Sequence, residues 1–397
     1  MKLMSKLLRY FGYILFRPIW WLERLMLRSN KIWVFGAWYG QKYSDNSKWL
    51  YEYVLEHNPE IKAVWITKNR DVYNKLCSQN KPVCLSASAK GAWWCLRAKY
   101  AFLTSGVVDV NMFFLNGAKQ IWLWHGMPLK KILNCADEWL AVSRGHKIVS
   151  KILNPYQSFR PYETVTSSDF FTPYLQQSFG LPENRILKTG LPRCDAFFTD
   201  LTEKIVRNIR RKFNGAKILL YMPTFRMSSE RNGTLFNPFD SKFNFEQEEF
   251  INFLEQENIV FLYKPHFVDS GVNVNINSNR FILLNDSQFE DLYVLLNSVD
   301  MLVTDYSSVF FDFIPSKKPI FLLPFDYEEY LKSSRSHFFN MYEKMTGVIC
   351  KDWNDFYKNF KDQNWEKIDF AKNNNLAEYL DGNSCKKIIC MIQEVCL

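Results

Sequence analysis

Short apolar runs alternate with helix-like stretches along this chain of 397 residues, and the alternation limits its fold more than any other feature. Runs such as AVWIT and IVFLY are apolar at consecutive positions, so both faces of such strands must be covered. That pattern is typical of a parallel sheet with helices on both faces, and it predicts an α/β fold. The expected strands are Ile32–Phe35, Ala63–Thr67, Val83–Leu85, Tyr100–Thr104, Gln120–Trp124, Thr164–Ser167, Lys217–Met222, Ile259–Tyr263, Phe281–Leu284, Met301–Val303 and Pro319–Leu323.

One charged stretch, Thr199–Gly215, separates these strands into two series. It contains EKIVRNIRRKF, which predicts a helix, and a new series of strands follows it. The length suits two domains, each with its own core. We expect one α/β domain over 31–205, a second over 206–375, and a C-terminal helix over 376–397 that could pack back on the first domain. Further helices are expected at Asn46–Leu55, at Leu133–Ser143 and from Ser168 onward.

The positive charge is concentrated at the N-terminus. Residues 1–31 hold seven basic side chains against one acid, Glu23, a net charge of +6. The remaining residues share 43 basic and 40 acidic groups. A body so nearly neutral argues against a general nucleic-acid or polyanion-binding protein.

Residues 1–30 predict a basic amphipathic helix that lies on a membrane surface. The longest uncharged apolar run, Tyr10–Phe16, is too short to span a bilayer, and no signal-peptide cleavage site follows it. Basic side chains beside Trp and Phe are typical of a segment in the membrane interface. The alternative is an ordinary first helix packed on the core. The expected membrane contacts are Lys2, Lys6, Arg9, Phe11, Arg17, Trp20 and Trp21.

Cysteine and glycine patterns exclude several kinds of site. The nine cysteines include no C-x-x-C pair, so neither a zinc site nor a disulfide framework is indicated. The chain has no P-loop, no G-x-G-x-x-G and no Asp-x-Asp. We predict no metal site and no tightly bound cofactor, although a divalent ion could assist.

The stretch WHGMPLKK, residues 124–131, follows one predicted strand directly. His125 stands where a strand ends, and histidine has the pKa range to accept a proton from a hydroxyl. Gly126 would allow a substrate or another backbone to approach closely. Lys130 adds a cation to the same loop. The alternative is a structural histidine whose ring bonds a loop carbonyl.

Cationic side chains follow two strands of the second series. Arg226 ends YMPTFR and could pair with phosphate oxygens, although a surface ion pair is the plainer interpretation. Lys264 and His266 stand two residues apart in KPH, so both could reach one anionic group in an extended chain.

The run TDYSS, which precedes an apolar helix, is the strongest single signal. Its side chains and the backbone amides at the helix start could hold phosphate without a metal. Plain N-capping is the alternative, and the two interpretations are compatible. The candidate residues are Thr304, Asp305, Ser307 and Ser308.

Taken in order, these motifs resemble the CDP-glycerol glycerophosphotransferase family, which includes teichoic-acid primases and polymerases. The resemblance rests on Tyr43–Asn46, WHGMPLKK, Leu181–Asp195, YMPTFR, KPH, TDYSSVFFDF, Pro324–Tyr330 and Asp381–Ser384. It implies two Rossmann-like domains facing a cleft, as in glycosyltransferase-B-like enzymes, bound peripherally to the cytoplasmic face of a bacterial membrane. It also implies transfer of glycerol phosphate from CDP-glycerol to a lipid-linked or polymeric acceptor in teichoic-acid or capsule-type synthesis, with release of CMP.

The resemblance assigns roles to matching positions. His125 would deprotonate the acceptor hydroxyl, with His266 as the second catalytic histidine. The donor pyrophosphate would lie among Arg226, Lys264, His266, Thr304, Asp305, Ser307, Ser308, Arg335, Gly126 and Lys130, while Arg193 and Asp195 organise the cleft. Met127, Phe267 and the stretch 337–340 depart from the family pattern.

Four alternatives remain at this point. The donor could be CDP-ribitol or another CDP-alditol, or the chain could be a nucleotide-sugar glycosyltransferase of the same fold. If it is not an enzyme, the chain could be a scaffold at the membrane surface without catalytic activity, or a polyanion-binding module. The intact His125, Lys264, His266 and TDYSS argue against the scaffold, and the near-neutral body argues against the module. The acceptor and the oligomeric state stay open.

Overall fold

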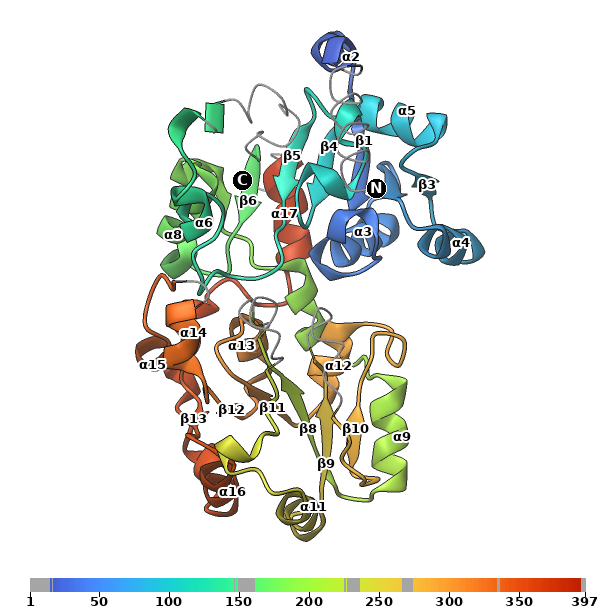
Figure 1. The fold of residues 1–397 in the computed structure, drawn as a ribbon. Helices are drawn as coiled ribbons and strands as arrows, with labels where there is room; N and C mark the ends of the chain where they lie inside the picture. The colour runs from blue at the N-terminus through green and yellow to red at the C-terminus, as the bar shows by residue number, and fades with distance from the viewer. Residues whose placement is uncertain are drawn as a thin grey trace, which may run out of the picture.

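Two parallel sheets form the framework of the computed structural model, which describes residues 15, 17–145, 147–148, 161–224, 226, 236–265, 274–333 and 336–393. One sheet with its helices lies above the other in Figure 1. Every strand pairing within the described residues is parallel. The predicted α/β fold with parallel sheets is therefore confirmed.

The first sheet has seven strands in the order β3-β2-β1-β4-β5-β6-β7. The order reverses direction between β1 and β4, so this is the point at which a crevice opens beyond the strand ends. The strands are β1 (Ser29–Gly36), β2 (Lys62–Thr67), β3 (Val83–Leu85), β4 (Ala98–Leu103), β5 (Lys119–Trp122), β6 (Glu163–Val165) and β7 (Ile186–Leu187). The α-helices of this part are α2 (Arg17–Leu22), α3 (Asp45–His57), α4 (Arg70–Ser78), α5 (Ala89–Arg97), α6 (Asp137–Leu140) and α8 (Thr172–Phe179).

The second sheet repeats this arrangement with six strands in the order β10-β9-β8-β11-β12-β13. Its reversal lies between β8 and β11. The strands are β8 (Lys217–Met222), β9 (Ile259–Tyr263), β10 (Phe281–Leu283), β11 (Met301–Thr304), β12 (Ile320–Leu322) and β13 (Val348–Ile349). The accompanying helices are α9 (Lys204–Lys212), α11 (Gln247–Gln256), α12 (Leu292–Ser298), α13 (Val309–Phe313), α14 (Tyr327–Ser333), α15 (Met341–Lys344) and α16 (Trp353–Lys361), and α17 (Ser384–Gln393) follows them in the chain. We call the parts built on the two sheets the first half and the second half.

The central strands are buried on both faces, which explains their continuous apolar sequence. Trp33, Phe35 and Phe102 of the first sheet have no exposed surface, and Phe35 stacks on Phe102 at 4.8 Å between ring centroids. In the second half, Phe261 of β9 contacts Phe250 and Trp353 from the helices that cover it. Large aromatic side chains fill these cores because each removes much apolar area from water.

One expected helix is shorter in the structure, and two strands of the structure are not predicted by the sequence. The helix expected over Leu133–Ser143 is a 3-10 turn at Leu133–Cys135 followed by α6 alone, because Ala136 between them has an extended backbone (φ −64°, ψ 135°). Strands β7 and β13 were not expected. Each has two residues, too few for a pattern of alternation or of continuous apolar character.

The chain passes between the halves twice, and the two crossings lie against each other. The 3-10 segment Pro192–Phe198 leads toward α9, and α17 returns from the second half to the first. The Asp195 carboxylate accepts hydrogen bonds from the backbone N–H groups of Ser384 and Cys385, both at 3.0 Å, and so caps α17. Tyr100 of β4 donates to the Ile392 carbonyl at 3.4 Å. Figure 1 shows α17 among the elements of the first half.

Candidate functional site

The candidate residues stand at the carboxyl ends of strands next to the two reversal points. Trp38 follows β1, Thr104 follows β4 and His125 follows β5. In the second half Thr304 ends β11, and Lys264 follows β9. Loops at this edge of a doubly wound sheet are the usual place for a ligand.

His125 is held in one tautomer by the backbone. Its Nδ1 lies 3.2 Å from the carbonyl oxygen of Thr104, and a carbonyl can only accept, so Nδ1 carries the proton. The other ring nitrogen, Nε2, is then the one able to take a proton. The imidazole stacks on Trp124 at 4.2 Å between centroids and contacts Trp38 at 5.3 Å. This tautomer has the chemistry that a base toward a hydroxyl requires.

The backbone around His125 is conformationally unusual. Trp38, Tyr39, Asp45 and Trp124 all have φ between +47° and +67°, a region that such residues seldom adopt. Non-glycine residues with positive φ cluster at functional sites because the surrounding structure must enforce them. The strain thus marks the loops that surround the histidine.

Asp109, which the sequence analysis missed, ties two of these loops together. Its carboxylate accepts hydrogen bonds from the N–H groups of Tyr39 at 2.6 Å, Thr104 at 2.8 Å and Ser105 at 2.6 Å. Burial raises the pKa of Asp109 to about 6, although the three N–H groups oppose the shift. The sequence around it, VVDV, carried no signal beyond a lone acid in an apolar stretch.

Gly126 and Lys130 contact the second half, as their predicted place in a cleft requires. Gly126 has φ +132°, and a Cβ there would lie 3.0 Å from Ser308 Oγ and 3.1 Å from Arg193 Nη2. Lys130 forms an isolated antiparallel bridge with His337. Its ammonium lies 5.2 Å from the ring centroid of Tyr330 and 5.7 Å from that of Tyr306. The loop after β5 therefore brings His125 beside the TDYSS run.

Thr304 and Asp305 are internal to the second half. Both have no exposed surface. Thr304 donates its hydroxyl to the Met222 carbonyl at 2.7 Å, and Asp305 accepts from the Thr224 N–H at 2.8 Å. We expected both to contact the donor, but these bonds give them a supporting place behind the strand ends. Ser307 and Ser308 are partly exposed.

Arg226 lies buried in the second half. It is 2% exposed, and its guanidinium makes a two-point contact with Asp326, both N···O distances being 2.8 Å. A further nitrogen lies 2.8 Å from Asp305. Burial alone would lower the pKa of Arg226, but these carboxylates raise it well above its usual range. The structure thus shows a buried ion pair where a surface ion pair was the plainer interpretation.

Lys264 lies at the end of β9 and pairs with Asp286. Its Nζ is 3.0 Å from Asp286 Oδ1, and Lys42 of the first half lies 2.6 Å from Oδ2. Burial raises the pKa of Asp286, but the two lysines outweigh that effect and lower it to about 2. Two other predicted site residues, His266 and Arg335, lie outside the described residues.

The predicted membrane segment is described only in part. Lys2, Lys6, Arg9 and Phe11 lie outside the described residues. Arg17 is partly exposed and Trp21 is 56% exposed. Trp20 is only 5% exposed because it packs against Met112 and Phe113, so the structure corrects its assignment to the membrane surface. Among the described residues, no helix has both the length and the apolar character to cross a bilayer.

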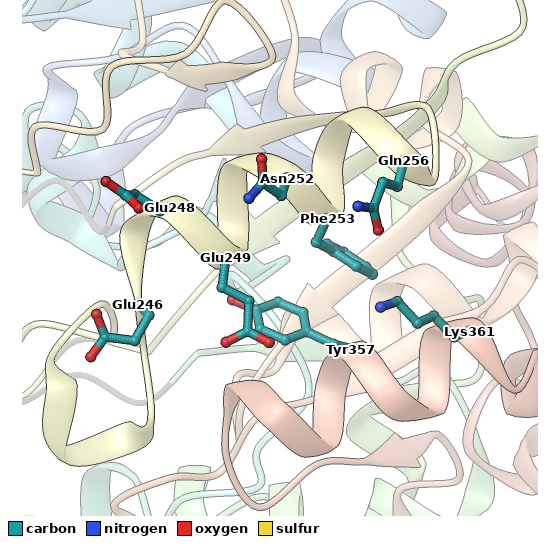
Figure 2. Close-up of a pocket in the computed structure, with 8 residues that line it drawn as sticks. All are labelled: Glu246, Glu248, Glu249, Asn252, Phe253, Gln256, Tyr357 and Lys361. Carbon is teal, nitrogen blue, oxygen red and sulfur yellow. The ribbon is translucent and has the colours of Figure 1, made fainter.

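A separate hollow of about 590 Å³ lies between α11 and α16, away from the candidate residues. Figure 2 shows its lining side chains, Glu246, Glu248, Glu249, Asn252, Phe253, Gln256, Tyr357 and Lys361. It contains none of the predicted site residues. Across the described part of the chain, no group of three or more His, Cys, Asp or Glu side chains could hold a metal ion.

Comparisons with known proteins agree on one family. Residues 18–394 match the family described as CDP-Glycerol:Poly(glycerophosphate) glycerophosphotransferase. The teichoic acid glycerol-phosphate transferase of Staphylococcus aureus is 26% identical over 339 residues, which cover 82% of each chain. The teichoic acid ribitol-phosphate polymerase TarL of the same organism is 27% identical over 232 residues, 56% of this chain and 40% of that one.

The same relationship holds for the fold. The structure of the wall teichoic acid polymerase TagF superposes with a TM-score of 0.75 at 22% identity, and the match covers 98% of this chain and 97% of the other. Both parallel sheets therefore belong to a framework that solved structures share.

Proposed function

This chain belongs to the CDP-glycerol:poly(glycerophosphate) glycerophosphotransferase family and is a transferase, and we propose that it moves glycerol phosphate from CDP-glycerol to a hydroxyl of a lipid-linked or polymeric acceptor. The observation that carries the proposal is the placement of His125. Its Nδ1 is committed to the Thr104 carbonyl, and its loop meets Ser308 of the second half at Gly126.

In the proposed reaction His125 Nε2 takes the proton of the acceptor hydroxyl. The acceptor oxygen forms a bond to the phosphorus that carries glycerol, and the bond from that phosphorus to the bridging oxygen of CMP breaks. CMP leaves with the electron pair of that bond, and the new product is a phosphodiester. Phosphoryl transfer depends on position and on neutralised charge more than on covalent chemistry by the protein.

On the donor side, Ser307, Ser308 and Lys264 are the residues proposed to contact the pyrophosphate. The helix after the serines is short, Val309–Phe313, so hydroxyls and nearby amides matter more here than a helix dipole. Thr304, Asp305 and Arg226 support this edge from within. His266 and Arg335 keep their proposed places beside the donor.

A donor panel scored by CMP release tests the reaction. Wild-type protein is incubated with CDP-glycerol, CDP-ribitol or a nucleotide sugar, together with a lipid-linked glycerol-phosphate acceptor. His125→Gln should lower kcat by about 10²–10⁴-fold, the usual contribution of a general base, with the Kd for CDP-glycerol little changed. His57→Gln is the matched control, because His57 is exposed at the end of α3. If no CDP-alditol releases CMP, or if His125→Gln abolishes donor binding, the proposed reaction is wrong.

CDP-ribitol is the second candidate donor. The match to a ribitol-phosphate polymerase favours keeping it in the panel. Faster CMP release from CDP-ribitol than from CDP-glycerol would reassign the substrate while leaving the chemistry at His125 unchanged.

We also propose that the protein rests on the cytoplasmic face of the membrane through its N-terminal region. Trp21, Leu25 and Leu27 are 56%, 80% and 81% exposed, and Trp93 of α5 is 51% exposed. Arg28 joins the two regions, since it donates to the carbonyls of Cys95 and Ala98 at the end of α5. Apolar side chains beside arginines suit an anionic lipid surface.

Sedimentation with vesicles tests this placement. The double variant Trp21→Ser/Trp93→Ser should bind vesicles of phosphatidylglycerol and phosphatidylcholine more weakly than wild type, with unchanged CMP release from a soluble acceptor. Equal sedimentation of wild type with these vesicles and with neutral ones would contradict the role of the basic residues.

A further inference from the structure

A buried arginine joins the two halves beside the proposed base. Arg193 lies in the segment Pro192–Phe198 and is 3% exposed. One terminal nitrogen lies 2.7 Å from Asp45 at the start of α3, and the other lies 2.7 Å from Asp312 of α13. Its guanidinium also lies over the ring of Tyr293 at 4.7 Å. The first aspartate belongs to the first half and the second to the second half.

On the side of the first half, the contacts lead to His125 along two routes. Asp45 accepts a hydrogen bond from the indole N–H of Trp38 at 3.0 Å, and the Trp38 ring contacts His125. The Arg193 N–H donates to Asn46 at 3.1 Å. Asn46 in turn donates to the carbonyls of Leu123 and Trp124, at 3.1 and 2.9 Å, directly before the histidine. The Trp38 ring is thus tied to the side chain of Arg193, and the backbone directly before His125 is tied to the backbone N–H of Arg193.

On the side of the second half, the contacts lead to the serines. Asp312 also accepts from the Tyr293 hydroxyl at 2.9 Å, so its carboxylate is held from two directions. It lies in α13, which begins immediately after Ser308, and the Phe311 N–H donates to the Ser308 carbonyl at 3.1 Å. The Arg193 guanidinium itself would be 3.1 Å from a Cβ at Gly126.

We infer that Arg193 is a positioning residue that sets His125 of the first half relative to Ser307 and Ser308 of the second. This inference rests on the proposed function. A guanidinium is planar and presents its nitrogens in a fixed fork, so two carboxylates bound to it have a defined separation and orientation. Stability alone accounts poorly for the arrangement, because well-packed apolar residues often replace a buried ion pair without loss.

Lys48 provides a matched control, because it lies in α3, the helix that also contains Asp45. Its ammonium lies 2.6 Å from Asp291, which caps α12 of the second half, and the two side chains are 14% and 7% exposed. This pair also joins the halves and is largely buried. Asp291 also accepts hydrogen bonds from the backbone N–H groups of Tyr293 and Val294, so within the described residues this pair bonds the start of α12 rather than Trp38 or α13.

The test compares Arg193→Lys with Lys48→Met, because Arg193→Met would strand two buried carboxylates. At a temperature well below both melting points, Arg193→Lys should lower kcat by about 10²-fold, the effect of a misplacement near 1 Å, with the KM for CDP-glycerol nearly constant. Lys48→Met should lower Tm with little change in kcat. In a His125→Gln background, Arg193→Lys should cost no more than about threefold, because the two residues would act as one unit.

A second measurement does not depend on turnover. The ring signal of His125 in an NMR titration, assigned by its loss in His125→Gln, should shift its midpoint in Arg193→Lys and not in Lys48→Met. A wild-type protein that releases no CMP would contradict the proposed function, and the titration would still decide the inference. An unmoved midpoint, or a full additional loss of kcat in the double variant, would overturn the positioning role.

Discussion

Two buried arginines have nearly the same surroundings and join different parts of the molecule. Arg193 and Arg226 are 3% and 2% exposed, each pairs with two aspartates, and each lies over a tyrosine ring at 4.7 and 4.6 Å. The partners of Arg193 come from both halves. Those of Arg226, Asp305 and Asp326, follow β11 and β12 of one sheet. The same chemistry therefore does two things. Arg193 forms a joint between the two halves, and Arg226 makes one edge of the second half rigid.

The difference assigns separate effects to the two arginines. Loss of the Arg193 joint should change the position of the base relative to the donor, and this should lower kcat. Loss of the rigid edge should change the shape of the donor side itself, which is a property of donor binding and of stability.

The largest effect is expected from Arg226→Met. It leaves Asp305 and Asp326 buried without their cation, which costs about 3–5 kcal/mol of unfolding free energy. The Kd for CDP-glycerol should rise at least about tenfold, since every 1.4 kcal/mol of lost binding is tenfold. Urea unfolding and calorimetry measure the two quantities. Arg280→Met is the control, because Arg280 bonds Asn258 near the opposite end of the same sheet. Unchanged donor binding in a folded Arg226→Met protein would break the comparison.

A smaller effect is expected on the pH dependence of stability. It tests whether the residues around Arg226 also contact the first half. Tyr306 and Tyr330, which lie over Arg226, also contact Lys130 of the first half and His337. Burial, aided by the charge of Lys130, lowers the pKa of His337 to about 4. Between pH 6.5 and 4 the unfolded state therefore binds a proton that the folded state excludes, and stability falls as the pH falls.

The loss attached to His337 is about 2 kcal/mol of unfolding free energy by pH 4.5. Thermal unfolding of wild type and His337→Phe at pH 7.5 and 4.5 measures it, and the variant should lose less stability on acidification. Equal losses in both proteins would show that this contact between the halves does not sense pH.

The smallest effect is expected from Lys42→Met. The pair of Lys42 with Asp286 also joins the halves, but its side chains are 42% and 49% exposed. Exposed pairs contribute at most about 1 kcal/mol. Tm and kcat should both stay close to the wild-type values, and added salt should reduce even the small difference. A tenfold fall in kcat would mean that burial is not what distinguishes the Arg193 joint.

The repeating framework could be predicted from the sequence because strands buried on both faces have an unambiguous pattern. All eleven expected strands overlap strands of the two sheets. Positions that depend on backbone conformation could not be predicted in this way. The extended backbone of Ala136 (ψ 135°) divides a stretch that otherwise resembles one helix, and nothing in its residue type announces it.

The candidate site was predictable by position and less so by contact. Gly126, next to His125, meets Ser308 because both loops follow strand ends, which the sequence shows. The carboxylates opposite Arg226 and Lys264 come from Asp326 and Asp286, which belong to other segments of the chain, so the sequence did not show these ion pairs. Trp20 was assigned by its neighbours in sequence, but it packs against residues some 90 positions away.

The paired crossings between the halves restrict how these halves can move. Gly190 precedes the first crossing, and a Cβ on it would lie 2.4 Å from the carbonyl of Tyr379 in the second. A few residues later, the hydrogen bonds from the start of α17 to Asp195 join the two crossing segments a second time. Two attachment points side by side define a hinge axis. Rotation of the halves about that axis is permitted, whereas twisting and sliding of one half against the other are resisted. A donor could then enter and CMP could leave by one swing, after which the base would return to the same register.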